Sequence, residues 1–219
     1  MSADVERTRF NMVEQQIRPW EVLDTKVLDL LYKVRREDYV PDAHKSLAFA
    51  DLEIPLGHGE TMLSPKLEAR MLQELAVNPD DRILEIGTGS GYMTALLASQ
   101  GAHVYSVDIV SEFTRSANAR LAQHDMHNVT LETGDAACGW NKYGPYDVIV
   151  LTGSTPVLPE AFQLSLKAGG RLFAVVGVAP AMEAQLITCT ASGAYGTVGL
   201  FETVIPVLRN ASQRARFVF

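Results

Sequence analysis

A short apolar run that breaks into a glycine-rich turn constrains this chain more than any other stretch. The run covers residues 83–86, and the turn places Gly87, Gly89 and Gly91 at alternate positions. This pattern predicts a buried strand that turns tightly into a helix. Glycine permits backbone angles closed to other residues and lets a ligand approach the main chain. Because the first amides of a helix carry partial positive charge, the stretch predicts a site for a nucleotide-like cofactor.

Strands and helices alternate along the chain from residue 82 onward. Predicted strands cover 82–86, 103–108, 129–131, 148–151 and 171–176, with predicted helices over 91–99, 111–123 and 159–166. The alternation predicts an α/β fold whose doubly wound, mostly parallel sheet has helices on both faces. Residues 184–190 and 195–208 are strand-rich around a glycine turn, which predicts an antiparallel pair at one edge and seven strands in all.

The first sixty residues follow a different pattern. Residues 4–17 and 24–34 have helical periodicity. Residues 40–59 contain several prolines and glycines, a pattern that predicts irregular structure. We expect residues 1–60 to form an amino-terminal helical and irregular cover over a cofactor-binding domain of residues 61–219, the two making one compact unit.

A helix is predicted over residues 65–75. Ser64 is a suitable N-cap and Pro65 a suitable first helical residue. This capping role is the alternative to any catalytic role for Ser64.

Composition excludes several functional classes. The net charge is −7 without a dense Lys/Arg run, so nucleic acid and anionic membranes are poor default partners. The sequence shows no signal-peptide core and no apolar segment that could span a bilayer. Cys138 and Cys189 make no disulfide framework and lack metal-ligand spacing. We expect a cytoplasmic protein with no metal site, and the sequence sets no oligomeric state.

Two acidic residues follow consecutive predicted strands. Asp108 ends the second strand, where a carboxylate can accept hydrogen bonds from ribose hydroxyls. Asp135 follows the third strand, where a side-chain oxygen can accept a hydrogen bond from the exocyclic amine of adenine. Since ligands of such sheets bind at the carboxyl ends of strands, the two acids and the glycine turn together predict an adenosine-containing cofactor.

The glycine spacing separates two candidate cofactors. A dinucleotide fingerprint needs its third glycine at the sixth position, which here is Tyr92. The spacing Gly87-x-Gly89-x-Gly91, with Glu85 before it, is similar to the first motif of class I S-adenosylmethionine (SAM) methyltransferases. We therefore expect SAM, with NAD as the competing cofactor. The predicted cofactor-binding residues are Glu85, Gly87, Thr88, Gly89, Ser90, Gly91, Tyr92, Asp108, Ile109, Gly134, Asp135, Ala136 and Thr152.

The residues after the fourth strand bear on the methyl acceptor. Amino-group methyltransferases usually carry Asn/Asp-Pro-Pro-aromatic there, whereas this chain has residues 152–155, Thr-Gly-Ser-Thr. The five histidines are scattered, and none is a convincing general base. Because only a protonated nucleophile needs a base, an ionised acceptor such as a carboxylate is favoured.

Many segments in the same order resemble the protein-L-isoaspartate O-methyltransferase family. They are residues 12–19, 36–41, 54–57, 85–92, 134–135, 139–140, 145–149, 169–172 and 176–177. The resemblance implies SAM as donor, a protein or peptide substrate with an isoaspartyl carboxylate as acceptor, and a role in protein repair. It also implies a Rossmann-like methyltransferase sheet whose final strands depart from the common order.

One segment departs from the family pattern. The family usually shows Gly-Gln-Thr-Ile-Ser before x-Pro, its serine lying near the acceptor, whereas Leu63 stands at that position here and a hydroxyl follows at Ser64. Glu60 replaces the glutamine, and a carboxylate facing inward would repel an anionic acceptor. Ala136 stands where the family commonly has glycine.

Thr61 and Ser64 are the predicted catalytic residues, which would position the acceptor. We expect SAM binding to survive the departures from the family pattern. Two alternatives to isoaspartyl methylation stay open, namely a methyltransferase with a different acceptor and a SAM-binding module without turnover.

Overall fold

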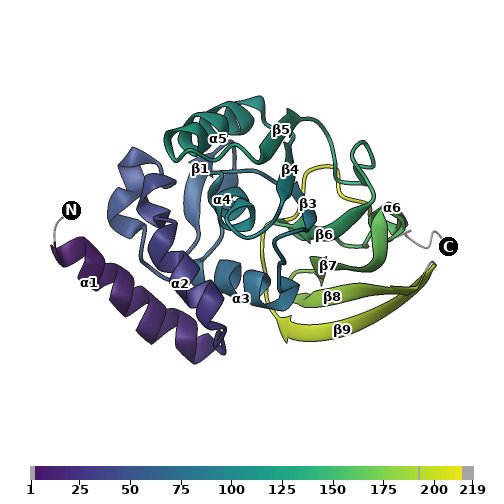
Figure 1. The fold of residues 1–219 in the computed structure, drawn as a ribbon, viewed down its shortest axis with the longest axis horizontal. Coiled ribbons are helices and arrows are strands. Elements are labelled where there is room, and N and C mark those ends of the chain that lie inside the picture. The colour runs from purple at the N-terminus through teal and green to yellow at the C-terminus, as the bar shows by residue number, and fades with distance from the viewer. Residues whose placement is uncertain (1–2, 192, 214–219) are drawn as a thin grey trace.

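A seven-stranded sheet forms the centre of the computed structural model, which describes residues 3–191 and 193–213 (Figure 1). The strands lie in the order β5, β4, β3, β6, β7, β8, β9. Their bounds are β3 Arg82–Ile86, β4 His103–Asp108, β5 Val129–Thr133, β6 Tyr146–Leu151, β7 Leu166–Val178, β8 Ala181–Ala191 and β9 Ala194–Glu202. Strands β3 to β7 are parallel, and β8 and β9 pair antiparallel at one edge. The predicted α/β sheet is confirmed.

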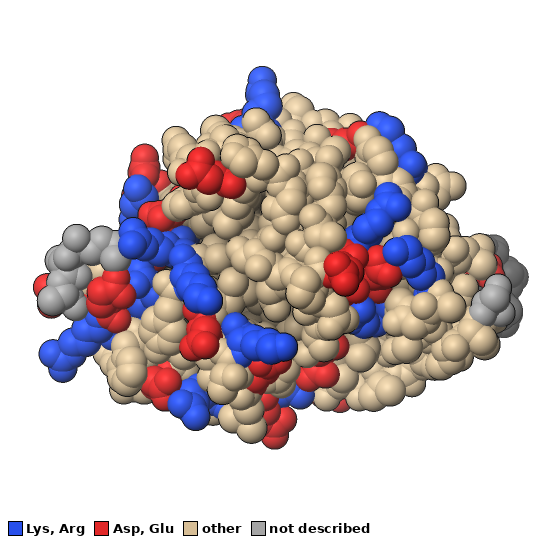
Figure 2. All heavy atoms as spheres, viewed as in Figure 1, with Lys and Arg blue, Asp and Glu red and all other residues tan. Residues whose placement is uncertain are grey.

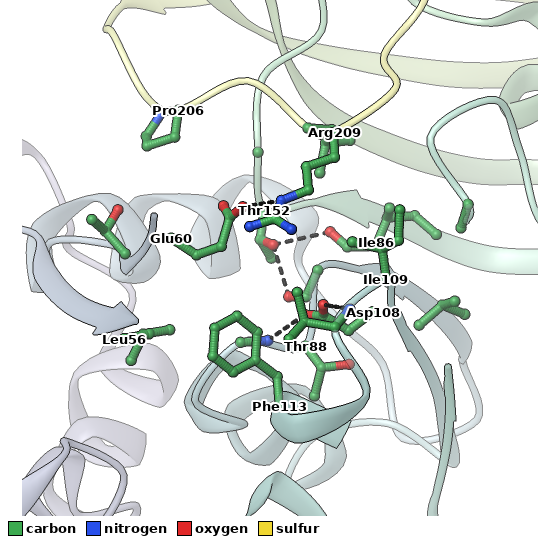
Figure 3. A pocket seen from close by; sticks show the side chains of 18 of the residues that line it. Leu56, Glu60, Ile86, Thr88, Asp108, Ile109, Phe113, Thr152, Pro206 and Arg209 are labelled. Carbon is green, nitrogen blue, oxygen red and sulfur yellow. Dashed lines mark hydrogen bonds and ion pairs between the residues drawn. The ribbon is translucent and has the colours of Figure 1, made fainter. Parts of the chain in front are cut away.

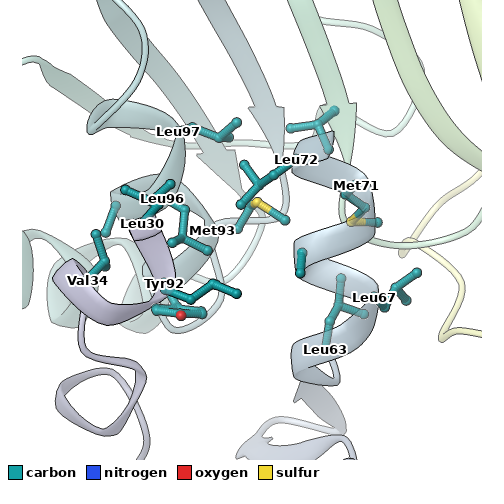
Figure 4. Packing of buried hydrophobic residues seen from close by; sticks show 14 of the residues in the cluster. Leu30, Val34, Leu63, Leu67, Met71, Leu72, Tyr92, Met93, Leu96 and Leu97 are labelled. Carbon is teal, nitrogen blue, oxygen red and sulfur yellow. The ribbon is translucent and has the colours of Figure 1, made fainter. Parts of the chain in front are cut away.

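Helices cover both faces of this sheet. They are α3 (Pro65–Leu75), α4 (Tyr92–Ala98), α5 (Ser111–Gln123) and α6 (Glu160–Leu164). Side chains of β3 alternate between two apolar clusters. Ile83 belongs to the cluster that contains residues of α3 and α4, while Leu84 packs with Phe162 of α6. Figure 4 shows Leu67, Met71 and Leu72 of α3 near Met93, Leu96 and Leu97 of α4 in the first cluster. Because both faces are buried, an uninterrupted apolar run is typical of such a strand.

The amino-terminal residues form a helical cover at one side of the sheet (Figure 1). It consists of α1 (Ala3–Met12), a π-helical turn (Val13–Ile17), α2 (Thr25–Lys33) and 3₁₀ turns at Arg18–Trp20, Arg36–Asp38 and Asp42–Leu47. Asp24 caps α2 by accepting a hydrogen bond from the Lys26 amide at 2.8 Å. Leu30 and Val34 join the apolar cluster that contains Ile83, so the cover and the sheet share one core.

The prediction of irregular structure over residues 40–59 was wrong in its last part. Strands β1 (Ile54–Gly57) and β2 (Glu60–Met62) form a separate antiparallel hairpin. Its turn holds Gly57, His58 and Gly59, all at positive φ. The pattern did not reveal β1 because a four-residue strand that contains a proline shows no apolar alternation.

The carboxyl-terminal prediction of strand over 195–208 was also too long. Strand β9 ends at Glu202, and residues 203–213, which we call the strap, leave the sheet and run past the loop after β6. Ser154 holds the strap there, because its amide donates to the Pro206 carbonyl at 2.8 Å and its carbonyl accepts the Leu208 amide at 2.9 Å. Proline has no amide hydrogen for a sheet ladder, which favours departure from the sheet at this point.

Smaller differences concern element ends. The helix predicted over 159–166 is shorter, since α6 ends at Leu164 and Leu166 already pairs with Tyr146 as the first residue of β7. Predicted strand ends elsewhere lie within a few residues of the observed ones.

Acidic and basic side chains are interspersed over the face shown in Figure 2, without a continuous basic stripe. Across the described residues, none of the helices has the length and apolar character needed to cross a membrane.

Candidate cofactor and acceptor site

A cavity opens at the carboxyl ends of the parallel strands, between the hairpin, the glycine-rich turn and the strap (Figure 3). Ten predicted cofactor residues line it: Gly87, Thr88, Gly89, Ser90, Asp108, Ile109, Gly134, Asp135, Ala136 and Thr152. The parallel topology brings them together, because the ends of β3, β4, β5 and β6 meet at one edge of the sheet. Three other predicted residues, Glu85, Gly91 and Tyr92, lie outside this lining.

The glycine turn, residues 87–91, requires glycine at its first position. Gly87 has φ +101°, and a Cβ built on it would lie 2.2 Å from Oγ1 of Thr152. That hydroxyl is held in place, since it donates to the carbonyls of Ile86 and Gly87 at 2.9 and 2.8 Å. The turn is therefore a close backbone approach that a larger residue would disrupt.

Asp108 links the glycine turn to the end of β4. Its carboxylate accepts the Gly89 amide at 2.9 Å and the Val110 amide at 2.8 Å. Burial raises the pKa of Asp108, and the two amide hydrogen bonds oppose that rise. The carboxylate has lone pairs left to accept hydroxyl groups of a ligand.

Glu85 and Tyr92 support the turn from behind. Glu85 is fully buried and accepts a hydrogen bond from the Thr94 hydroxyl, while burial raises its pKa to about 8. Its Oε1 has no hydrogen-bond partner among the described residues. Tyr92 packs against Tyr39 and lies 5.2 Å from the guanidinium of Arg36, so both side chains belong to the core beneath the cavity.

Residues 60–63, which we call the acceptor wall, form the opposite side of the cavity. Glu60, Thr61 and Leu63 line it, and the Thr61 hydroxyl donates to Glu53 at 2.9 Å. Leu63 is only 6% exposed and joins the main apolar cluster. Ser64 does not line the cavity; it is the N-cap residue of α3 by position, with no side-chain capping hydrogen bond.

A buried ion pair holds the acceptor wall from behind. Arg36 pairs with Glu68, donates to the Leu63 carbonyl at 2.6 Å, and donates to the Ala48 carbonyl at 3.0 Å. Both partners are almost completely buried. Burial raises the pKa of Glu68 to about 7, against the opposite effect of Arg36. Arg36 lies within a segment, residues 36–41, that resembles the family, but no signal in the sequence indicates this role.

The strap forms the third side of the cavity and was missed from the sequence. Its residues 206–209 line the cavity. Arg209 donates to Glu60 at 2.6 Å and to the His58 carbonyl, and Asn210 donates to Asp135 at 2.8 Å. No sequence signal pointed to these contacts, because they join residues far apart along the chain.

The arrangement suits an adenosine-containing ligand. The glycine turn exposes backbone beside a buried carboxylate at Asp108, and Asp135 and Gly134 lie along the same row of strand ends. Gly87 lies so close to Thr152, another residue of the lining, that a Cβ would not fit between them. The residues present therefore fit the cofactor expected from the sequence.

Comparison with known protein families gives a match over most of the chain. A model of the family described as protein-L-isoaspartate(D-aspartate) O-methyltransferase matches residues 7–199. A protein-L-isoaspartate O-methyltransferase of Protochlamydia amoebophila (strain UWE25) is 37% identical over 174 residues, which are 80% of this chain and 82% of the relative.

Two solved structures share the fold. A Plasmodium falciparum protein assigned as a protein-L-isoaspartate O-methyltransferase, crystallised with S-adenosyl-L-homocysteine, has a TM-score of 0.78 at 18% identity, covering 91% of this chain and 97% of its own. A second protein-L-isoaspartate O-methyltransferase has a TM-score of 0.76 at 22% identity, covering 93% of this chain and 65% of its own. At these identities the structures show the shared fold.

Proposed function

The chain belongs to the protein-L-isoaspartate(D-aspartate) O-methyltransferase family, and on that premise we propose that it methylates the side-chain carboxylate of isoaspartyl residues in proteins or peptides. It is a SAM-dependent methyltransferase. The observation that carries the proposal is the single cavity that joins the glycine turn and Asp108 to the acceptor wall.

The residues proposed to hold the cofactor follow from their places around the cavity. The Asp108 carboxylate would accept the ribose hydroxyls, and Asp135 with Gly134 and Ala136 would face the adenine. The glycine turn would lie against the remaining part of the cofactor, with Glu85 and Tyr92 supporting it from below. When bound, SAM supplies an electrophilic methyl group on a sulfonium.

The chain's own contribution to the reaction is binding, alignment and exclusion of water. A carboxylate acceptor is already ionised at neutral pH, so no side chain has to remove a proton. Alignment of two reactants can supply most of the rate enhancement in such a displacement. Thr61, which Glu53 orients, is the proposed positioning residue, and the apolar side chains of Leu63 and Phe113 limit water. Ser64 remains a prediction that the lining of the cavity does not support.

The test uses an isoaspartyl peptide, its normal aspartyl twin and radiolabelled SAM. We expect base-labile label on the isoaspartyl peptide alone, because a methyl ester hydrolyses in base. Absence of label, with SAM binding intact in calorimetry, would overturn the proposed acceptor. Binding of NADH in place of SAM would overturn the cofactor.

Leu63 favours a second candidate, a methyltransferase with a less polar acceptor. A buried leucine can neither donate a hydrogen bond nor orient a carboxylate. If the missing hydroxyl limits isoaspartyl methylation, Leu63→Ser raises kcat/KM for the isoaspartyl peptide, although loss of the buried side chain destabilises the fold by about 2–5 kcal/mol. The rate is expressed per folded molecule. It is measured at a temperature below the thermal unfolding transition of the variant. An unchanged rate would leave the apolar wall as a determinant of a different acceptor.

The expected cytoplasmic location stays a prediction.

A further inference from the structure

The charges around the cavity are unbalanced. Four carboxyl groups line it, those of Glu60, Glu68, Asp108 and Asp135, whereas Arg209 is the single basic residue among the described residues of the lining. A cavity of this kind suits a cationic sulfonium. It opposes entry of an anionic acceptor, because like charges close together repel strongly where water is partly excluded.

Three of the four carboxyl groups have partners that do not involve Arg209. Glu68 pairs with Arg36 behind the acceptor wall. Asp108 accepts two backbone amides. Asp135 accepts the side-chain amide of Asn210. Glu60 is the remaining carboxylate, and it lies on the acceptor wall itself.

Arg209 is held against Glu60 in a defined geometry. Its Nε donates to Oε1 of Glu60 at 2.6 Å (Figure 3). Its Nη2 donates to the His58 carbonyl in the hairpin turn. The strap supplies the arginine, and Ser154 anchors the strap three residues and one residue earlier, at Pro206 and Leu208. The pair is partly exposed, with 42% of the Arg209 side chain and 30% of the Glu60 side chain accessible. The guanidinium is thus positioned by one carboxylate and one backbone carbonyl.

We propose that Arg209 is a specificity-determining residue whose positive charge cancels Glu60, so that a carboxylate acceptor can enter the cavity. The proposal rests on the carboxyl-methylating function proposed above. In this proposal, the negative charge that Glu60 adds in place of the family's glutamine is compensated by the positive charge of Arg209 on the strap. Both charges also act on Asp108, where Glu60 raises and Arg209 lowers the pKa of the carboxyl group, which shows that the pair influences the interior of the cavity.

The experiment compares KM for the isoaspartyl peptide, at saturating SAM, between the wild type and variants of the Arg209–Glu60 pair. Arg209→Leu leaves Glu60 uncompensated, and we expect KM to rise about tenfold with kcat changed less than about threefold. The double variant Glu60→Gln, Arg209→Leu removes both charges and should return KM to within about threefold of the wild-type value. Arg209→Lys keeps the charge and should stay close to wild type. Added salt should reduce the Arg209→Leu effect.

The double variant separates charge compensation from a merely structural role. If Arg209 acts only by tying the strap to the hairpin, the double variant lacks the same tie and stays as impaired as Arg209→Leu. That result, or an unchanged KM in Arg209→Leu, overturns the proposal. Arg18→Leu is the matched control, since Arg18 forms a pair of similar exposure with Glu14 outside the cavity lining.

A binding measurement keeps this test separate from the test of the function. Anisotropy of a fluorescein-labelled isoaspartyl peptide is followed with protein saturated with S-adenosylhomocysteine. If wild-type protein binds the peptide without methylating it, the proposed function fails, and loss of binding in Arg209→Leu with recovery in the double variant still supports the role of Arg209. Binding that is indifferent to Arg209, or no binding to any form, overturns that role.

Discussion

The glycine turn and the acceptor wall face each other across one cavity but are held by different means. The glycine turn is held by its own backbone and by Asp108, which lies 19 residues from Gly89. The acceptor wall is held by hydrogen bonds from two charged side chains that are distant in sequence. Arg36 binds the carbonyl of Leu63, 27 residues away along the chain, and Arg209 binds Glu60, 149 residues away. The two sides therefore have different weaknesses, since the glycine turn is sensitive to added atoms and the acceptor wall to lost charges.

Each region also contains a buried carboxyl group with a different environment. Glu68 behind the acceptor wall is paired with Arg36. Glu85 behind the glycine turn contacts hydroxyl groups, and burial raises its pKa to about 8. The carboxyl group behind the acceptor wall therefore has a cation as its partner, whereas the one behind the glycine turn has a hydroxyl group and no cation among its hydrogen-bond partners in the described residues.

The largest effect should come from breaking the charge pair of the acceptor wall. Arg36→Met leaves Glu68 buried without a cation, and we expect the free energy of unfolding to fall by about 3–5 kcal/mol. Urea unfolding at neutral pH measures this loss. Arg18→Met, at an exposed pair, is the control and should cost less than about 1 kcal/mol. Equal losses in the two variants would contradict a charge-held acceptor wall.

The next effect tests the glycine turn by adding one carbon. Gly87→Ala combines a left-handed backbone cost of roughly 1–2 kcal/mol with overpacking of about 1–3 kcal/mol against Thr152. We expect this loss in unfolding free energy together with loss of S-adenosylhomocysteine binding in calorimetry. Gly59→Ala is the matched control, because its φ is also positive but nothing lies within 4 Å of the new Cβ. If both variants bind alike, the turn is not a close approach to the cofactor.

A smaller effect is expected on cofactor affinity. Asp108→Ala removes the proposed ribose acceptor, and S-adenosylhomocysteine affinity should weaken by about 1–3 kcal/mol. Calorimetry with the exposed Asp80→Ala as control measures the difference. Unchanged affinity would remove Asp108 from the cofactor site and leave the glycine turn as the main contact.

The smallest effect is a pH dependence that belongs to the glycine turn. The pKa of Glu85 is about 8 in the folded protein against an ordinary value of 4.5. Below pH 4.5 the group is protonated in both states. As pH rises from 4.5 to 8, the unfolded chain loses the proton and the folded chain keeps it, so folding stability falls.

Glu85→Gln should remove this fall. The difference in unfolding free energy between the variant and the wild type should shift in favour of the variant by about 1 kcal/mol from pH 6 to pH 7. Urea unfolding at the two pH values measures it without cofactor. A difference that stays constant with pH would mean that Glu85 is ionised in the folded protein.

Much of the sheet and of the glycine turn could be predicted from the sequence. Strand β3 is recognisable because a strand buried on both faces needs an apolar run. The tight turn at Gly87 is recognisable because glycine adopts a positive φ that other residues avoid. Asp108 follows from topology, since parallel strands end at the same edge. The glycine spacing then favoured SAM, the absence of the amino-group motif after the fourth strand favoured a carboxylate acceptor, and the resemblance to the family implied an isoaspartyl substrate.

The hairpin, the strap and the role of Arg36 could not be predicted in this way. A short strand such as β1 leaves no periodic signal, and strap residues resemble a strand until Pro206 is seen to leave the sheet. The partner of Arg209 is 149 residues away. No local pattern identifies such a pair.

The sheet and the cofactor turn therefore follow from the amino-acid sequence, because backbone sterics and burial act over a few neighbouring residues. How the acceptor wall is held, and which charge faces Glu60, become apparent only in the folded protein. These depend on side chains that meet across the cavity from the cover, the hairpin and the strap, and electrostatic pairing is governed by distance in space.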